Sequence, residues 1–199
     1  MAALLPSGRC GWCRQRIGAR PYLLELCIAV AATIVVLAAP TIPVLLAGLW
    51  WAGCAVPLVF IDTRVHRLPD VLTMPAAAGV LALLTVDAAV GDRWDHLLSA
   101  AVCAAVTTAV FVSMGLLLGS RGMGLGDAKL TLSATALLGW WGWGAAFGAV
   151  FLGFLGAGFV GVALLASGRV HRGTHIPMGP FFIAGTVVML ALVDGTPAK

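Results

Sequence analysis

Residues 144–166 read GAAFGAVFLGFLGAGFVGVALLA, a run of 23 residues without a charged side chain. A bilayer core about 30 Å thick requires about 20 consecutive apolar residues in a spanning helix. The run is therefore long enough to cross a membrane as one helix. Gly153, Ala157 and Gly161 recur at every fourth position and line one face of that helix. Such small-residue faces let helix backbones approach closely in lipid, so we expect a seam within a helical bundle.

The chain as a whole is also rich in apolar residues and poor in charged ones. Of its 199 residues, 61% are hydrophobic and 10% are charged, whereas soluble domains carry about 25% charged residues. The mean hydropathy is +1.03. This leaves too little polar surface for a soluble enzyme, a disordered chain or a disulfide-framed secreted domain. We predict an all-α integral membrane protein that is surrounded by membrane lipid and has no nucleic-acid partner.

Seven apolar stretches, separated by charged or Pro/Gly-bearing breaks, predict a polytopic bundle of about seven transmembrane helices. They cover residues 22–39, 42–61, 71–90, 97–118, 128–139, 144–166 and 176–193. The fifth stretch is short for a crossing, so a count of six helices stays open.

Basic residues set the expected direction of the chain, because Lys and Arg favour the cytoplasmic side of short loops. With the N-terminus inside, all of the 12 Lys and Arg residues except Arg93 and Lys199 lie on the cytoplasmic side. The outer loops then hold acids, or tryptophans typical of a membrane interface. We predict a cytoplasmic N-terminus.

Residues 1–20 differ from the remainder and are expected to form a short cytoplasmic segment before a membrane domain at residues 21–199. No apolar stretch of signal-peptide length occurs in this segment. It carries a single CxxC pair, Cys10 and Cys13. Two thiolates do not complete a four-ligand zinc site, so no metal or other cofactor is expected.

Acidic residues at the ends of apolar helices are functional candidates, because charge is costly in lipid. Asp62 ends the second predicted helix, Asp70 begins the third and is able to cap it, and Asp127 begins the fifth. All three lie toward the cytoplasmic side in the predicted topology. Two carboxylates that meet there can share a proton and activate water, as in aspartic proteases. Spacing alone leaves this open, since an Asp after a glycine run is often only a helix cap.

Three glycines alternate directly before the acid of the fifth helix: Gly122, Gly124 and Gly126. We expect them to permit unusual backbone conformations and the close approach of chain or substrate. Lys129 and the start of the helix are expected to favour the ionised form of Asp127. Asp62, at the carboxyl end of a helix, is then expected to hold the shared proton more often.

The two acidic segments resemble the paired signatures of type IV prepilin peptidases, bacterial aspartyl proteases of the GxGD type. The segments are residues 61–75, IDTRVHRLPDVLTMP, and residues 122–130, GMGLGDAKL. The segment IPMGPF at residues 176–181, which contains Pro177, is similar to the Pro/Gly motif of that family's last helix. The resemblance implies that Asp62 and Asp127 are the catalytic pair and that the cleavage uses no metal.

The resemblance also implies a biological role. A member of this family is an inner-membrane endopeptidase that removes the basic leader peptide of prepilin or pseudopilin precursors at the cytoplasmic face, in type IV pilus or type II secretion systems. Longer members carry a domain with two CxxC pairs that is associated with methylation of the new N-terminus. With one such pair here, we do not expect methyltransferase activity. The particular prepilin and the oligomeric state stay open.

Several residues around the pair are expected to bind substrate or shape the site: Asp70, Gly122, Gly124, Gly126, Lys129 and Pro177. Because the leader is basic, we expect Asp70 to bind one of its Lys or Arg residues. Two other functions remain as alternatives: a proton-coupled membrane transporter, and a non-catalytic partner in pilus or secretion assembly.

Overall fold

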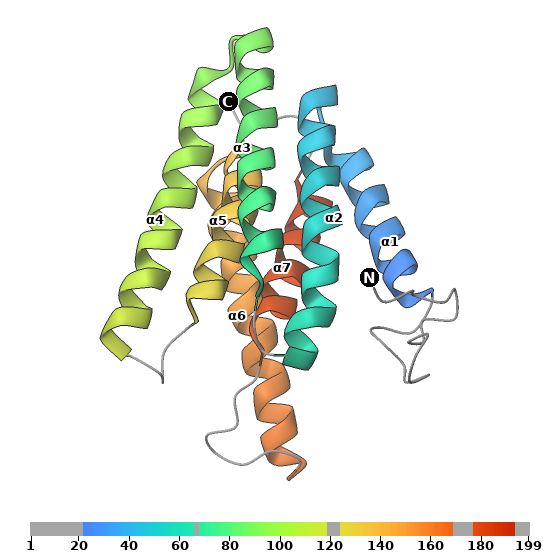
Figure 1. The fold of residues 1–199 in the computed structure, drawn as a ribbon, viewed down its shortest axis with the longest axis vertical. Helices are drawn as coiled ribbons and strands as arrows, with labels where there is room; N and C mark the ends of the chain where they lie inside the picture. Colours follow the sequence, from blue (N-terminus) through green and yellow to red (C-terminus); the bar gives the residue numbers. More distant parts are fainter. Residues whose placement is uncertain (1–21, 66–67, 119–123, 169–176, 194–199) are drawn as a thin grey trace.

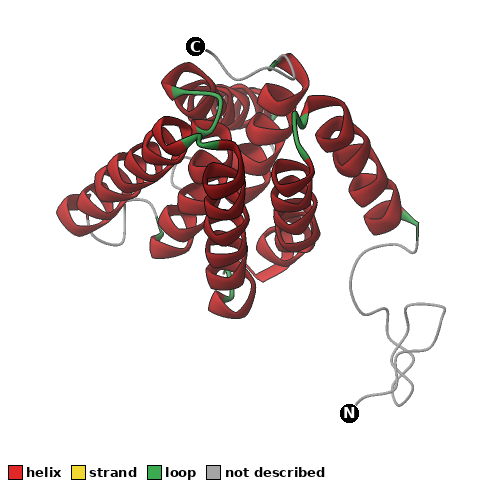
Figure 2. Ribbon diagram, turned by 90° about the horizontal axis from the view of Figure 1, so that it is seen from above, coloured by secondary structure: helices red, strands yellow, loops and turns green. Residues whose placement is uncertain are grey.

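The computed structural model describes residues 22–65, 68–118, 124–168 and 177–193, which form helices and short connections without a strand. The helices are α1 (Leu23–Ala38), α2 (Ile42–Val65), α3 (Asp70–Gly91), α4 (Trp94–Leu118), α5 (Leu125–Gly139), α6 (Trp143–Ala166) and α7 (Gly179–Leu192). They form one elongated bundle, seen from the side in Figure 1 and from above in Figure 2. The predicted all-helical fold is confirmed, with helix ends close to the predicted ones.

Four of these helices are long and apolar enough to cross a membrane: α2, α3, α4 and α6. Helices α1 and α7 are apolar but shorter. This is the make-up of a helical membrane protein. Seven separate crossings and the direction of the N-terminus stay predictions.

Helix α5 is the central helix of the bundle and packs against every other described helix except α1. Ten of its 15 residues are buried. Its hydroxyl groups on Thr131, Ser133 and Thr135 donate hydrogen bonds to backbone carbonyls of the preceding turn, at 2.6–2.9 Å. A helix enclosed by protein does not have to be apolar on every side. This explains why the fifth apolar stretch is short in the sequence.

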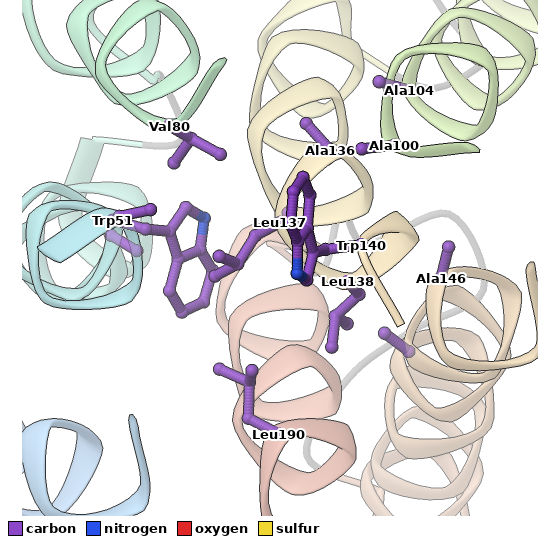
Figure 3. Packing of buried hydrophobic residues seen from close by; sticks show 14 of the residues in the cluster. Trp51, Val80, Ala100, Ala104, Ala136, Leu137, Leu138, Trp140, Ala146 and Leu190 are labelled. Carbon is purple, nitrogen blue, oxygen red and sulfur yellow. The ribbon is translucent and has the colours of Figure 1, made fainter. Parts of the chain in front are cut away.

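The hydrophobic core draws buried residues from all of the described helices, with α5 in its middle. Figure 3 shows Leu137 of α5 between the indole rings of Trp51 and Trp140, with Leu190 of α7 close by. Leu137, Trp51 and Trp140 are all 0% exposed. These side chains fix the position of α5 relative to α2 in the middle of the bundle.

Small residues of α6 form the expected seam, and its partner is α7. Gly153 and Ala157 are buried. A Cβ atom on Gly153 would lie 2.5 Å from Cδ1 of Phe182, so the phenyl ring lies directly on the α6 backbone. Within the described residues, this part of the small-residue face is therefore used inside the bundle.

An ion pair with a buried carboxylate lies near the C-terminal end of α3. Asp87 is 3% exposed, and its carboxylate accepts hydrogen bonds from Arg93 at 2.8 Å and from the hydroxyl of Thr41. Asp87 lies inside α3, which continues past it to Gly91. The ion pair ties α3 to the connection between α3 and α4, and the hydrogen bond from Thr41 joins α3 to the residue that precedes α2.

Candidate active site

Asp62 lies in the last turn of α2 and is buried, with 6% of its surface exposed. Helix α2 continues to Val65, so Asp62 lies inside the helix rather than after its expected end at residue 61. Its Oδ2 atom accepts a hydrogen bond from the backbone N–H of Gly179 at 3.1 Å. A buried carboxylate on α2 is thus bonded to the first residue of α7.

Gly179 is a site residue that the sequence analysis missed. It is the first residue of α7, where backbone N–H groups have no partner inside the helix and carry partial positive charge. A Cβ atom at this position would lie 2.7 Å from Oδ2 of Asp62, so the close approach requires glycine. Pro177, which we expected to shape the site, is half-buried two residues earlier. The signal that could have found Gly179 is a glycine directly before Pro180 at the start of a helix.

Asp127 is the third residue of α5 and does not cap it. The capping position is taken by Gly124, and no side-chain capping bond is formed. The backbone N–H of Asp127 bonds to the carbonyl of Gly124 at 3.0 Å, and the side chain is half-buried. The interpretation of Asp127 as a plain helix cap is therefore wrong.

Asp127 and Asp62 influence each other. Asp127 lies before the predicted fifth apolar stretch, residues 128–139, and outside the four helices that are long enough to cross a membrane. Burial together with the negative charge of Asp62 raises the pKa of Asp127 to about 6, against a smaller opposing effect of a hydrogen bond from the Gly124 backbone. This shift of the pKa is opposite in direction to the one expected from the start of the helix and from Lys129. One reason is that partial burial disfavours its charge more than the start of α5 favours it.

Lys129 forms an ion pair with Asp70 and not the expected interaction with Asp127. Its Nζ atom lies 2.7 Å from Oδ1 of Asp70, at the start of α3. Residues two apart on a helix do not face each other, so Lys129 and Asp127 point to different sides of α5. The expected cap at Asp70 is also wrong, because Pro69 occupies the capping position and the Asp70 carboxylate pairs with Lys129.

The glycines before Asp127 have different roles. Gly126 allows a close approach, since a Cβ atom there would lie 3.0 Å from Cβ of Leu68. Gly124 is exposed and has a φ of −66°, which any residue adopts, so no unusual backbone conformation is needed there. Gly122 lies outside the described residues, as do Cys10 and Cys13. Within the described residues, no three His, Cys, Asp or Glu side chains gather in a way that could hold a metal ion.

Fold and site together define a class: a helical membrane protein in which a carboxylate in the last turn of one helix acts electrostatically on a carboxylate in the first turn of another. A match to the type IV leader peptidase family covers residues 47–193, from the first half of α2 to the end of α7. The chain belongs to this family.

Curated relatives agree with this assignment. The "Prepilin leader peptidase/N-methyltransferase" of Aeromonas hydrophila is 34% identical over 184 residues, which is 92% of this chain and 62% of the relative. The protein of the same name from Burkholderia pseudomallei (strain 1026b) is 36% identical over 198 residues, or 96% of this chain and 60% of the relative. The chain thus spans about three fifths of the length of these relatives. No solved structure shows a significant match.

Proposed function

We propose that this protein is an aspartic endopeptidase of the cytoplasmic membrane that removes the leader peptide of type IV prepilin or pseudopilin precursors, with Asp62 and Asp127 as the catalytic pair. The observation that carries the proposal is the coupling of these two acids, which lie 65 positions apart and belong to different helices. Family membership supports the reaction type, and the relatives' printed names support the substrate class.

The geometry supports unequal roles for the two acids. Asp62 accepts the N–H of Gly179, an interaction that a carboxylate makes more strongly than a neutral acid. Asp127, with its raised pKa, holds a proton more readily than an ordinary aspartate does. Asp62 therefore takes a proton from water, whose oxygen attacks the scissile carbonyl carbon, while Asp127 donates its proton to the carbonyl oxygen. Collapse of this gem-diol intermediate breaks the C–N bond as the proton held by Asp62 passes to the leaving amine, while one hydroxyl proton of the intermediate returns to Asp127 and leaves the carboxyl product.

The cytoplasmic location of the site is part of the proposal. Asp62 lies in the last turn of α2, Asp127 in the first turn of α5, and Gly179 begins α7. These helix ends lie in the lower half of the bundle in Figure 1. Arg64 and Lys129 belong to the same end, which agrees with a cytoplasmic face. With the N-terminus inside and seven crossings, the leader would reach the pair from the cytoplasm. Reporter fusions at residue 92 and after residue 168 test this topology.

Cleavage by the purified full chain tests the proposal directly. The protein in detergent is mixed with a candidate prepilin, and mass spectrometry measures loss of the leader. We expect cleavage by the wild type and none by Asp62→Asn or Asp127→Asn, because a neutral amide can neither accept nor deliver the proton. Asp95→Asn, in the first turn of α4, is the matched control and is expected to cleave normally.

Three results would contradict the proposal. Substantial cleavage by either Asn variant at normal expression would exclude the aspartic mechanism. Absence of cleavage by the wild type, with several prepilins of the same genome, would favour a non-catalytic assembly partner. Proton flux into vesicles that requires Asp62 and Asp127, without any cleavage, would favour the transporter.

A further inference from the structure

We propose that the ion pair between Asp70 and Lys129 is a positioning device, which holds the start of α3 against the first turns of α5 and thereby sets the separation of Asp62 and Asp127. The inference rests on the proposed peptidase function and adds two positioning residues to it. It replaces the expectation that Asp70 binds the leader.

The first support is the way in which residues near Asp62 meet residues near Asp127. Leu68 lies on the backbone of Gly126, one residue before Asp127. Asp70 bonds to Lys129, two residues after Asp127. The contacts therefore lie on both sides of Asp127 along α5, and both come from the segment that follows Asp62. A shift of α5 relative to this segment would change the catalytic pair.

The second support is the position of Lys129 itself. It is the fifth residue of α5, close to the end where the helix dipole disfavours a cation. Asp70 is the first residue of α3, where an anion is favoured. The helix dipole of α5 therefore does not favour a cation at position 129. The carboxylate of Asp70, which lies across the interface on α3, does favour it. Because the side chains are 34% and 64% exposed, the pair contributes little to overall stability, and its removal leaves the bundle folded.

Steady-state kinetics with a prepilin separates positioning from leader binding. Misplacement of catalytic groups by about 1 Å lowers rates by up to about a hundredfold, so we expect Asp70→Asn and Lys129→Gln each to lower kcat about tenfold with KM unchanged. The double variant should lose no more than either single variant, because both remove one interaction. Exchange of the two charges, Asp70→Lys with Lys129→Asp, should restore most of kcat. Asp95→Asn serves as the control with unchanged kcat and KM.

A second measurement does not depend on cleavage. Hydrogen exchange of the full chain in detergent, followed by mass spectrometry, reports the opening of the first turns of α5. We expect peptides that cover residues 124–132 to exchange several-fold faster in Asp70→Asn than in Asp95→Asn. This measurement stands even if the wild type cleaves no prepilin, in which case only the proposed function fails.

Three results would overturn the inference. The first is a rise in KM for Asp70→Asn with Lys129→Gln unaffected, which would assign Asp70 to the leader. The second is independent, additive losses in the double variant. The third is unchanged exchange at residues 124–132 in both single variants.

Discussion

The backbone N–H of Gly179 and the Oδ2 atom of Asp62 are joined by a 3.1 Å hydrogen bond, although the two residues are 117 positions apart in the sequence. The bond places the N-terminus of α7 at one acid of the proposed catalytic pair. The bond orients the carboxylate and stabilises its negative charge. The C-terminal end of α2 alone would disfavour that charge, because the C-terminus of a helix carries partial negative charge.

Substitution of Gly179 tests the close approach between α7 and Asp62. A Cβ atom at this position would lie 2.7 Å from Oδ2, so Gly179→Ala must displace the carboxylate. We expect kcat for prepilin cleavage to fall by at least about tenfold, because the acid loses its alignment. Gly158→Ala on α6 is the matched control, since no atom lies within 4 Å of a Cβ there. Equal activity of the two variants would show that the approach does not matter for catalysis.

The pH dependence of cleavage follows from Asp127. Its pKa is raised to about 6 by burial and by the charge of Asp62. The form of the pair that holds one proton is therefore lost as the pH rises through about 6. An aspartate with the ordinary pKa of 3.8 would lose its proton about two pH units lower. We expect kcat/KM, which reports the free enzyme, to decline above this pH. A constant kcat/KM between pH 5 and pH 8 would contradict the assignment of the proton to Asp127.

The location of the shared proton can be observed by infrared spectroscopy. A protonated carboxyl group has a C=O stretching band that a carboxylate lacks. At pH 5, we expect one band from the pair that disappears in Asp127→Asn and remains in Asp62→Asn. The reverse pattern would support the assignment from helix ends alone, in which Asp62 holds the proton.

Stability depends on the ion pair at the other end of α3. Arg93→Gln would leave the buried carboxylate of Asp87 with the Thr41 hydroxyl but without the guanidinium group. We expect the free energy of unfolding to fall by about 1–3 kcal/mol, the cost of losing a hydrogen bond to a charged group, with kcat of the folded protein unchanged. Thermal unfolding in detergent measures this. Asp92→Asn is the control, since Asn tolerates the left-handed conformation found there (φ 53°) and is expected to leave the melting temperature unchanged.

The sequence predicts the helices well and the contacts between them poorly. Apolar runs and their polar breaks are local properties, so the bounds of α2 to α6 lie close to the predicted ones. The ionisation of Asp127 depends on Asp62, and the partner of Lys129 is Asp70, 59 positions away. Helix ends and near neighbours in the sequence predicted the opposite shift of the Asp127 pKa and did not identify the partner of Lys129. Gly179 was missed for the same reason, because its contact depends on how α7 packs against α2.

The central position of α5 has a consequence for biogenesis. The helix that carries Asp127 is 15 residues long and contains hydroxyl side chains and Lys129. Its insertion into lipid by itself is therefore unfavourable. Its neighbours α2, α3, α4, α6 and α7 provide the environment in which it is stable. We therefore expect the α5 segment to take up its position only after α6 and α7, which follow it in the chain, have been synthesised. Gly179, the partner of Asp62, also belongs to α7, so we expect the proposed peptidase activity to require the assembled bundle.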